Sequence, residues 1–270
     1  MCAIMLYRLT LLFLLLLPAA SGQTLSPVII DVFDDHERHC QSSMAYGLSW
    51  ELVVEAAKLS GIPLKAEEVS WDGAMTRLHN GKSKLVFGAL WSEERAQWAA
   101  FSVPLAPESS SLFTLPSNPV LRIEEIDLNS AVVGVSEGSV QQEYAKKLGF
   151  KHIYGTTNRS MLFGMLESGR IHYMINGDQF VNYFCMFQMS NTTVNCLRPV
   201  GQPIYSTFVH VIGLKKDLEA NLLLKRLNEG LAVTARQPGT PQKFKQHGFS
   251  QQQFLAWQEQ FTVDQGDSQP

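Results

Sequence analysis

Apolar runs of strand length alternate with amphipathic stretches of helical length from residue 28 onward. The short β-branched runs VIIDVF (28–33) and LVFGAL (85–90) are typical of buried strands. Between them, GLSWELVVEAAKLSG (47–61) carries apolar residues at helical spacing and ends on a glycine suited to a C-cap. The first half of the chain also predicts a strand at 63–69, a helix at 71–81 and a short helix starting near Ser92.

The same rhythm restarts after FSVPLAPESSSLFTLPSNPV (101–120). The pattern then predicts a strand at 131–136, a helix at 139–149, a strand at 151–155, a helix at 160–169, a strand at 170–176, a long buried strand at 204–216, a helix at 217–235 and another from Pro241 through QQQFLAWQEQF. Strands that alternate with helices indicate two α/β units with mainly parallel sheets, although the length also permits one larger sheet.

The first 22 residues have the layout of a secretory signal peptide. Arg8 precedes the apolar run LTLLFLLLLP, and small residues follow before Gln23. This run is shorter than the ~20 residues that a membrane span needs. We therefore expect cleavage before Gln23, with a retained N-terminal anchor as the alternative. Removal of Arg8 changes the formal net charge from −3 to −4.

The charge and the loops exclude several classes of ligand. A mildly acidic chain without a basic run has no electrostatic footprint for nucleic acid or anionic lipid. The loop GVSEGSVQQ (134–142) matches neither of the glycine-rich phosphate-binding patterns, so no nucleotide cofactor is expected. No later run of 18 apolar residues occurs, and the mature chain should be soluble.

Three cysteines remain after the signal segment. Ten residues separate Cys185 from Cys196, and in an exported chain these two favour a disulfide with Cys40 left free; three buried thiols are the alternative. Cys40 closes the segment DDHERHC, in which His36 and His39 stand three apart. A solvated polar loop is a better interpretation of this segment than a metal site, and we expect no metal.

In open α/β sheets, ligands bind beyond the carboxyl ends of the strands. At one such end Gly88 permits a close approach of the backbone, and Arg95 offers a planar fork for a carboxylate; pairing with Glu94 on a wet helix face is the alternative. At another end, Ser139 begins a helix that can receive an anion or is simply capped. Asp178 follows a third strand and can face a ligand ammonium group or solvent.

Four blocks in order resemble the family 3 bacterial solute-binding proteins. These blocks are YGLSWELVVEAAKLSG, WDGAMTRLHNGKSKLVFGALWSEERAQWAAFSVPL, IDLNSAVVGVSEGSVQQEYAKKLG and LESGRIHYMINGDQFVNYF. The resemblance spans residues 27–262. It implies a two-lobed, type II Venus-flytrap fold with two hinge crossovers near SSSLFTL and IYSTFV. Lobe 1 would comprise residues 25–107 plus 208–262, lobe 2 residues 108–207, and residues 263–270 a polar tail.

The resemblance also assigns ligand-binding positions in a cleft between the lobes. The resemblance implies that Arg95 clamps the ligand α-carboxylate and that Asp178 binds its amine. It also implies contacts with the ligand from the backbone of Gly88 and Leu90 and from the start of the helix at Ser139 and Val140. Trp71 and His36 would form the walls around the ligand side chain. Asp178 stands one residue later than the usual acid, so Asn176 and Gly177 compete for its place. DDHERHC also stands where the family has a Pro-plus-aromatic stretch. The residues assigned to the ligand carboxylate therefore match the family better than those assigned to the ligand amine.

The implied function is periplasmic capture of a small carboxylate-bearing ligand, such as a polar amino acid. The implied partner is an ABC importer or a membrane sensor, and the protein should be a monomer without catalytic residues. One alternative is a dehydratase-like enzyme on the same scaffold, for which His172 or Glu137 would serve. The other is a module whose degenerate cleft binds no small ligand.

Overall fold

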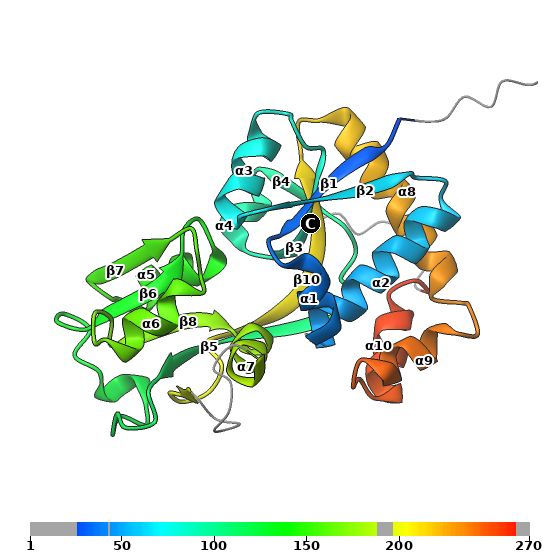
Figure 1. Cartoon of the computed structure of the whole chain (residues 1–270). Coiled ribbons are helices and arrows are strands. Elements are labelled where there is room, and N and C mark those ends of the chain that lie inside the picture. The colour runs from blue at the N-terminus through cyan, green and yellow to red at the C-terminus, as the bar shows by residue number, and fades with distance from the viewer. Residues whose placement is uncertain (1–25, 43, 188–196, 263–270) are drawn as a thin grey trace, which may run out of the picture.

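Ten strands join in one mixed sheet within residues 26–42, 44–187 and 197–262, the part of the chain that this computed structural model describes. The strand order is β2-β1-β3-β10-β5-β8-β6-β7, with β4 beside β10 and β9 beside β5. The sheet curls so that its two ends form two lobes, which lie side by side in Figure 1. Lobe 1 contains β1–β4 and lobe 2 contains β5–β9, while β10 belongs to both.

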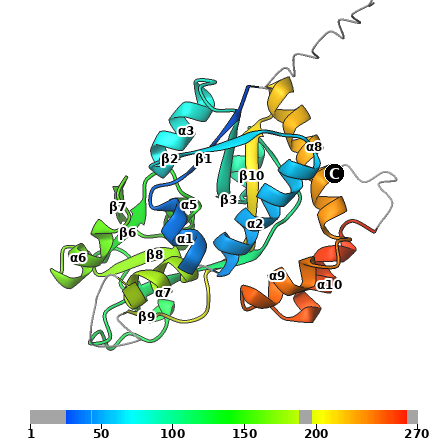
Figure 2. The same cartoon turned by 45° about the vertical axis from the view of Figure 1, so that its right-hand side comes forward.

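Lobe 1 is built on three parallel strands whose faces are covered by apolar clusters. β1 (Val28–Phe33) lies between β2 (Leu64–Val69) and β3 (Leu85–Leu90). Helices α2 (Met44–Leu59) and α8 (Leu218–Thr234) pack together on one face of this sheet, and α3 (Trp71–His79) covers the other (Figure 2). The expected strands and the long helices of this lobe are therefore confirmed, because each apolar face finds a partner.

Lobe 2 repeats this arrangement. β6 (Val132–Ser136) lies between the parallel strands β7 (His152–Thr156) and β8 (Tyr173–Gly177), and β5 (Pro107–Thr114) runs antiparallel to β8. The remaining elements of the lobe are α5 (Val140–Leu148), α6 (Met161–Glu167), α7 (Asp178–Phe187), the 3₁₀ turn Ile123–Glu125 and β9 (Arg198–Pro199). Separate apolar clusters form around α5 and around α6 with α7.

Strand β10 (Tyr205–Leu214) connects the lobes. Its first four residues pair with β5 in lobe 2, and from Val209 onward it pairs with β3 and then with β4 (Ala99–Phe101) in lobe 1. The predicted hinge segments SSSLFTL and IYSTFV lie on β5 and β10, side by side. We place the boundary between the lobes on this pair of strands.

Two sequence predictions about local structure are wrong. The segment DDHERHC is a turn followed by helix α1 (His36–Ser42), because burial of both histidines replaces the expected solvation. The last predicted helix is two helices, α9 (Thr240–Gln246) and α10 (Gln251–Glu259), because Gly248 turns the chain with a φ of 81°. Helix α7 is an element that the sequence pattern did not predict.

Some predictions fall outside the described residues. These are the signal peptide at 1–22, the polar tail at 263–270 and the cysteine at position 196. Cys185 is disulfide-bonded and Cys40 is a free thiol, so the pairing of Cys185 with Cys196 stays a prediction. Across the described ranges, no helix is long and apolar enough to span a membrane.

Candidate functional site

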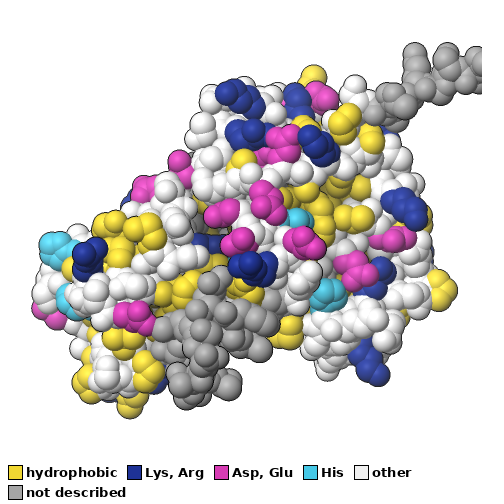
Figure 3. Space-filling view, in the orientation of Figure 1, with side chains coloured by type: hydrophobic (Ala, Val, Ile, Leu, Met, Phe, Trp, Pro, Cys, Tyr) yellow, Lys and Arg dark blue, Asp and Glu magenta, His cyan; other side chains and the backbone are white. Residues whose placement is uncertain are grey.

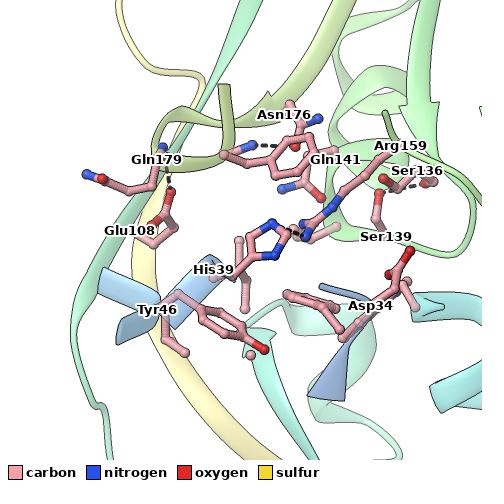
Figure 4. A pocket seen from close by; sticks show the side chains of 18 of the residues that line it. Asp34, His39, Tyr46, Glu108, Ser136, Ser139, Gln141, Arg159, Asn176 and Gln179 are labelled. Atoms are coloured by element: carbon pink, nitrogen blue, oxygen red, sulfur yellow. Dashed lines mark hydrogen bonds between the residues drawn. The ribbon is translucent and has the colours of Figure 1, made fainter. Parts of the chain in front are cut away.

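A cavity opens between the lobes at the carboxyl ends of the strands. Its walls come from the ends of β1, β3, β6 and β8 and from the first residues of α3, α5 and α7 (Figure 4). Among the predicted site residues, six line it: Trp71, Gly88, Leu90, Arg95, Ser139 and Val140. The rule that ligands bind beyond strand ends therefore pointed to residues that line this cavity.

Arg95 lines this cavity, and its side chain is fixed by contacts within lobe 1. The helix α4 (Glu93–Ala96) begins with Ser92, whose hydroxyl accepts a hydrogen bond from the Arg95 backbone N–H at 3.2 Å. The side chain is 3% exposed, donates from Nη1 to the Leu90 carbonyl at 2.6 Å and lies 5.0 Å from the centre of the Trp71 ring. Burial lowers the pKa of Arg95. The wet helix face considered from the sequence is thus not its environment.

The backbone conformation and the neighbouring rings at the end of β3 leave room only for glycine at position 88. Its φ is 85°, and a Cβ atom there would lie 3.0 Å from Phe33 Cε2 and 3.1 Å from Tyr46 Cε2. Both aromatic rings line the cavity. A side chain at this position would displace them, so the close backbone approach expected of Gly88 is present.

The start of α5 provides the corresponding surface in lobe 2. Ser139 caps the helix by accepting from the Gln142 N–H at 3.3 Å, and its hydroxyl donates to the Ser136 carbonyl at 2.7 Å. The N–H groups of the first helical turn lack helical partners. This end also receives Trp71 of lobe 1, whose Nε1 donates to the Gly138 carbonyl at 3.1 Å.

Two predicted residues are not among those that line the cavity. His36 is 8% exposed, hydrogen-bonds through Nδ1 to Tyr46 Oη at 2.8 Å and packs edge-on against Trp50. It lies in the core because its segment is helical, and His39, nearly one turn later, lines the cavity instead. Asp178 begins α7, and burial raises its pKa, while the competitors Asn176 and Gly177 do line the cavity.

His39, Arg159 and Glu108 line the cavity as well, and sequence reasoning gave them no ligand-binding role. His39 was weighed only as a metal ligand. Arg159 stands in the tripeptide Asn-Arg-Ser, which reads as a glycosylation sequon, and Glu108 lies in a segment that predicted no element. The only signal for Arg159 was its place after a predicted strand, β7, near the sheet edge.

Arg159 is fixed by the loop between β7 and α6. The Asn158 N–H donates to Thr156 Oγ1 at 3.2 Å, and Asn158 Oδ1 accepts from the Ser160 N–H at 3.1 Å. From this braced loop the guanidinium reaches His39 of lobe 1, with 2.8 Å between Arg159 Nη2 and His39 Nε2 (Figure 4). Burial and the nearby Arg159 lower the pKa of His39 to about 4, so the neutral imidazole accepts this hydrogen bond.

Glu108 lies at the start of β5, next to the crossover. Burial raises the pKa of its carboxyl group to about 8. At neutral pH the group is therefore mostly protonated, and it adds little negative charge to the cavity. One of its oxygens accepts a hydrogen bond from the Gln179 N–H at the start of α7, at 3.4 Å.

The lobes touch each other around the cavity. Besides the Trp71 and Arg159 contacts, the Ser92 hydroxyl donates to Glu143 Oε1 at 3.1 Å, and the Tyr205 hydroxyl donates to the Trp91 carbonyl. Figure 3 shows the lobes meeting along this junction, with acidic side chains gathered on lobe 1 beside it. The structure is thus a closed form. His172 and Glu137, which an enzyme would need, are not among the residues that line the cavity.

A two-lobed α/β protein with a cavity between its lobes, joined by two crossover strands, has the architecture of the periplasmic binding proteins. Solved structures agree. The arginine-, lysine- and histidine-binding protein of Geobacillus stearothermophilus matches with a TM-score of 0.67 and 18% identity, over 82% of this chain and 94% of that one. An ancestral arginine-binding protein bound to glutamine gives 0.64 and 19%, over 82% and 96%.

Other comparisons extend this result. A histidine kinase sensor domain similar to periplasmic binding proteins has a TM-score of 0.64 and 20% identity, over 88% of this chain and 96% of that one. A probable histidine-binding protein of Campylobacter jejuni is 25% identical over 136 residues, which are 50% of this chain and 53% of the relative. No family model matches the chain. The two-lobed fold that the resemblance to family 3 solute-binding proteins implied is confirmed.

Proposed function

We propose that this protein captures a small carboxylate-bearing ligand, a polar amino acid or a related compound, between its two lobes. The observation that carries the proposal is the buried guanidinium group of Arg95 on the cavity wall, opposite the start of α5. Among the described residues, no carboxylate lies within ion-pair distance of it. A buried cation without a carboxylate partner favours an anionic ligand.

Binding would stabilise the closed form. Arg95 lies in lobe 1 and the free N–H groups of α5 lie in lobe 2, so one carboxylate held by both would draw the lobes together. The paired strands β5 and β10 are the expected hinge. The names of the similar proteins support an amino acid as the ligand, since they include binders of histidine, arginine and glutamine.

The site of action follows from the same proposal. The signal-like N-terminal segment and the similarity to periplasmic binding proteins support export to the periplasm. There the protein would deliver its ligand to an ABC importer or a membrane sensor, acting by binding and closure without covalent chemistry. The similarity to a substrate-binding protein of an amino acid ABC transporter supports the first partner, and the similarity to a sensor domain supports the second.

A thermal-shift screen of the protein from Gln23 onward tests the proposal. Amino acids and small organic acids are added at several concentrations, and a true ligand raises the melting temperature as RT ln(1 + [L]/Kd) requires. We expect Arg95→Ala to abolish the shift and the exposed control Arg170→Ala to keep it. Equal binding by wild type and Arg95→Ala would refute the assignment of the site, and conversion of a hit, seen by mass spectrometry, would indicate an enzyme.

A further inference from the structure

Arg159 places its guanidinium group between two aromatic rings that belong to different lobes. The distance from Cζ to the ring centre is 4.6 Å for Phe33 of lobe 1 and 3.9 Å for Phe180 of lobe 2. The Phe33 ring also contacts Trp71 at 5.5 Å between ring centres, and Arg95 lies over Trp71. One row of aromatic rings therefore carries two guanidinium groups, and both face the same cavity.

The positive charge of this row is only partly balanced by the protein: the charge of Glu143 acts on Arg95 and that of Asp34 on Arg159, and each opposes the lowering of the pKa by burial. In the described part of the chain, neither Arg95 nor Arg159 has a carboxylate within ion-pair distance. Burial lowers the pKa of Arg159 to about 10, and the protonated Glu108 does not compensate. Asp34, the remaining acid on the cavity wall, is exposed, and it forms no ion pair with Arg159.

The guanidinium of Arg159 also keeps donors for a ligand. Its five N–H groups make one hydrogen bond to the described residues, the one to His39. The two phenyl rings make no hydrogen bonds with the guanidinium group, so its other N–H groups are available to a carboxylate, which it can bind through two hydrogen bonds. Close by, Asn176 lines the cavity, is 5% exposed, and its Nδ2 has no hydrogen-bond partner. The remaining N–H groups of Arg159 and Nδ2 of Asn176 are thus donors on the cavity wall without an acceptor among the described residues.

The geometry points to Arg159 as a specificity-determining residue that binds a second acidic group of the ligand. Its own guanidinium fills the space beside Phe33 and Phe180, and its charge would repel a cationic ligand side chain. The inference rests on the proposed capture of a first carboxylate by Arg95. The ligand class is then an acidic amino acid: Arg95 holds one carboxylate, Arg159 holds the other, and Asp34 faces the ammonium group. Similar proteins are named for arginine, lysine and histidine, whose cationic side chains this cavity excludes.

Isothermal titration of the protein from Gln23 onward tests the inference with matched probes. L-aspartate and L-glutamate carry both acidic groups, L-asparagine and L-glutamine lack the second charge, and L-arginine carries a cation instead. Wild type should bind an acidic amino acid at least about tenfold more tightly than its amide, the amount that one charged hydrogen-bonded pair provides. It should not bind L-arginine measurably.

Variants separate the two arginines. Arg159→Ala should remove the preference for the acid over the amide and, by emptying the space between Phe33 and Phe180, allow L-arginine to bind. Arg159→Lys keeps the charge without the planar fork and should retain part of the preference. The exposed control Arg170→Ala should behave as wild type. The melting temperature of each unliganded variant establishes that it is folded.

The outcomes distinguish the inference from the proposed function. If wild type binds L-arginine as tightly as any acidic amino acid, or if Arg159→Ala leaves the acid-to-amide ratio unchanged, the inference is wrong. If in that case Arg95→Ala still abolishes amino acid binding, the proposed function stands without it. If no probe binds to wild type, the inference is wrong, and the thermal-shift screen with its organic acids decides separately whether the proposed function stands.

Discussion

Nη2 of Arg159 lies 2.8 Å from Nε2 of His39, and this hydrogen bond joins lobe 2 to lobe 1 across the cavity. The same imidazole stacks on Phe180 with an interplanar angle of 10° and bonds through Nδ1 to the Asp35 carbonyl at 3.0 Å. A neutral His39 accepts from Arg159, whereas a protonated one would repel it. The contact therefore makes the closed form sensitive to pH.

The stability of the protein should fall on acidification, in part through His39. Its pKa is about 4 in the folded protein and near 6.5 when unfolded, so the unfolded chain binds more protons between these values. Stability rises with pH through this window and is lost as the pH falls. Urea unfolding at pH 7 and pH 5 should show a loss that is about 1–2 kcal/mol smaller in His39→Gln than in wild type.

The pKa values of His36 and His210 are also lowered to about 4. The stability that wild type loses on acidification should therefore be larger than the part that His39 contributes. His152→Gln, at an exposed position, is the matched control and should show the wild-type dependence. An identical pH dependence in wild type and His39→Gln would contradict the buried neutral state of His39.

Glu108 should have the opposite effect. Its pKa is about 8 when folded and near 4.5 when unfolded, so the folded protein holds a proton that the unfolded chain has lost. The stability from this group is complete below pH 4.5 and is lost as the pH rises through 8. Glu108→Gln keeps a neutral side chain at all pH values. In urea unfolding, its stability relative to wild type should therefore increase from pH 5 to pH 8.

The exposed Glu167→Gln is the control for this measurement and should follow wild type at both pH values. A constant difference between Glu108→Gln and wild type at pH 5 and pH 8 would mean that Glu108 is ionised in the folded protein.

Gly88→Ala should destabilise the protein by about 1–3 kcal/mol, because the new methyl group meets Phe33 and Tyr46 at a φ of 85°. Chemical unfolding measures this change. Gly164→Ala is the matched control: Gly164 lies in helix α6, and no atom from outside the backbone of that helix lies within 4 Å of the place a methyl group would take. Alanine there should be neutral or stabilising by about 0.5–1 kcal/mol. Similar effects of both substitutions would argue against a steric role for Gly88.

Trp71→Phe should weaken ligand binding several-fold with little change in the free energy of unfolding. The substitution keeps an aromatic ring beside Phe33 but removes the Nε1 donor to the Gly138 carbonyl, a contact present only when the lobes are closed. Titration calorimetry with the ligand from the screen measures the change. Trp98→Phe, which packs on His79 away from the cavity, should bind as wild type does. Unchanged affinity in Trp71→Phe would show that this bond does not favour closure.

Much of the fold could be read from local pattern. The strand β3 is apolar on both faces, β1 is apolar except for Asp31, and α2 and α8 show a helical stripe, so each element is specified within its own few residues. The capped helix after β3 followed from Ser92 and its two acids. Arg95 could be proposed because a strand end, a glycine and an arginine occur together in one short segment.

The remainder depended on contacts between distant segments. Helix α1 forms from a polar segment because lobe 2 supplies Phe180, Tyr183 and Arg159 to bury His39. Phe33 and Arg159 are 126 positions apart in the sequence and lie in different lobes. The guanidinium of Arg159 contacts Phe33 because the two lobes are closed on each other. No local pattern encodes such a meeting.

Hydrophobic periodicity and helix capping act over a few residues, so most strands, the long helices and the carboxylate-binding candidate Arg95 could be predicted from the sequence alone. Which charged groups are buried depends on the tertiary structure. In the folded protein His36 lies in the core, His39 lines the cavity, burial raises the pKa of Glu108, and Arg159 contacts two aromatic rings. Burial and charge compensation depend on what the rest of the chain places nearby, and that is a property of the closed fold.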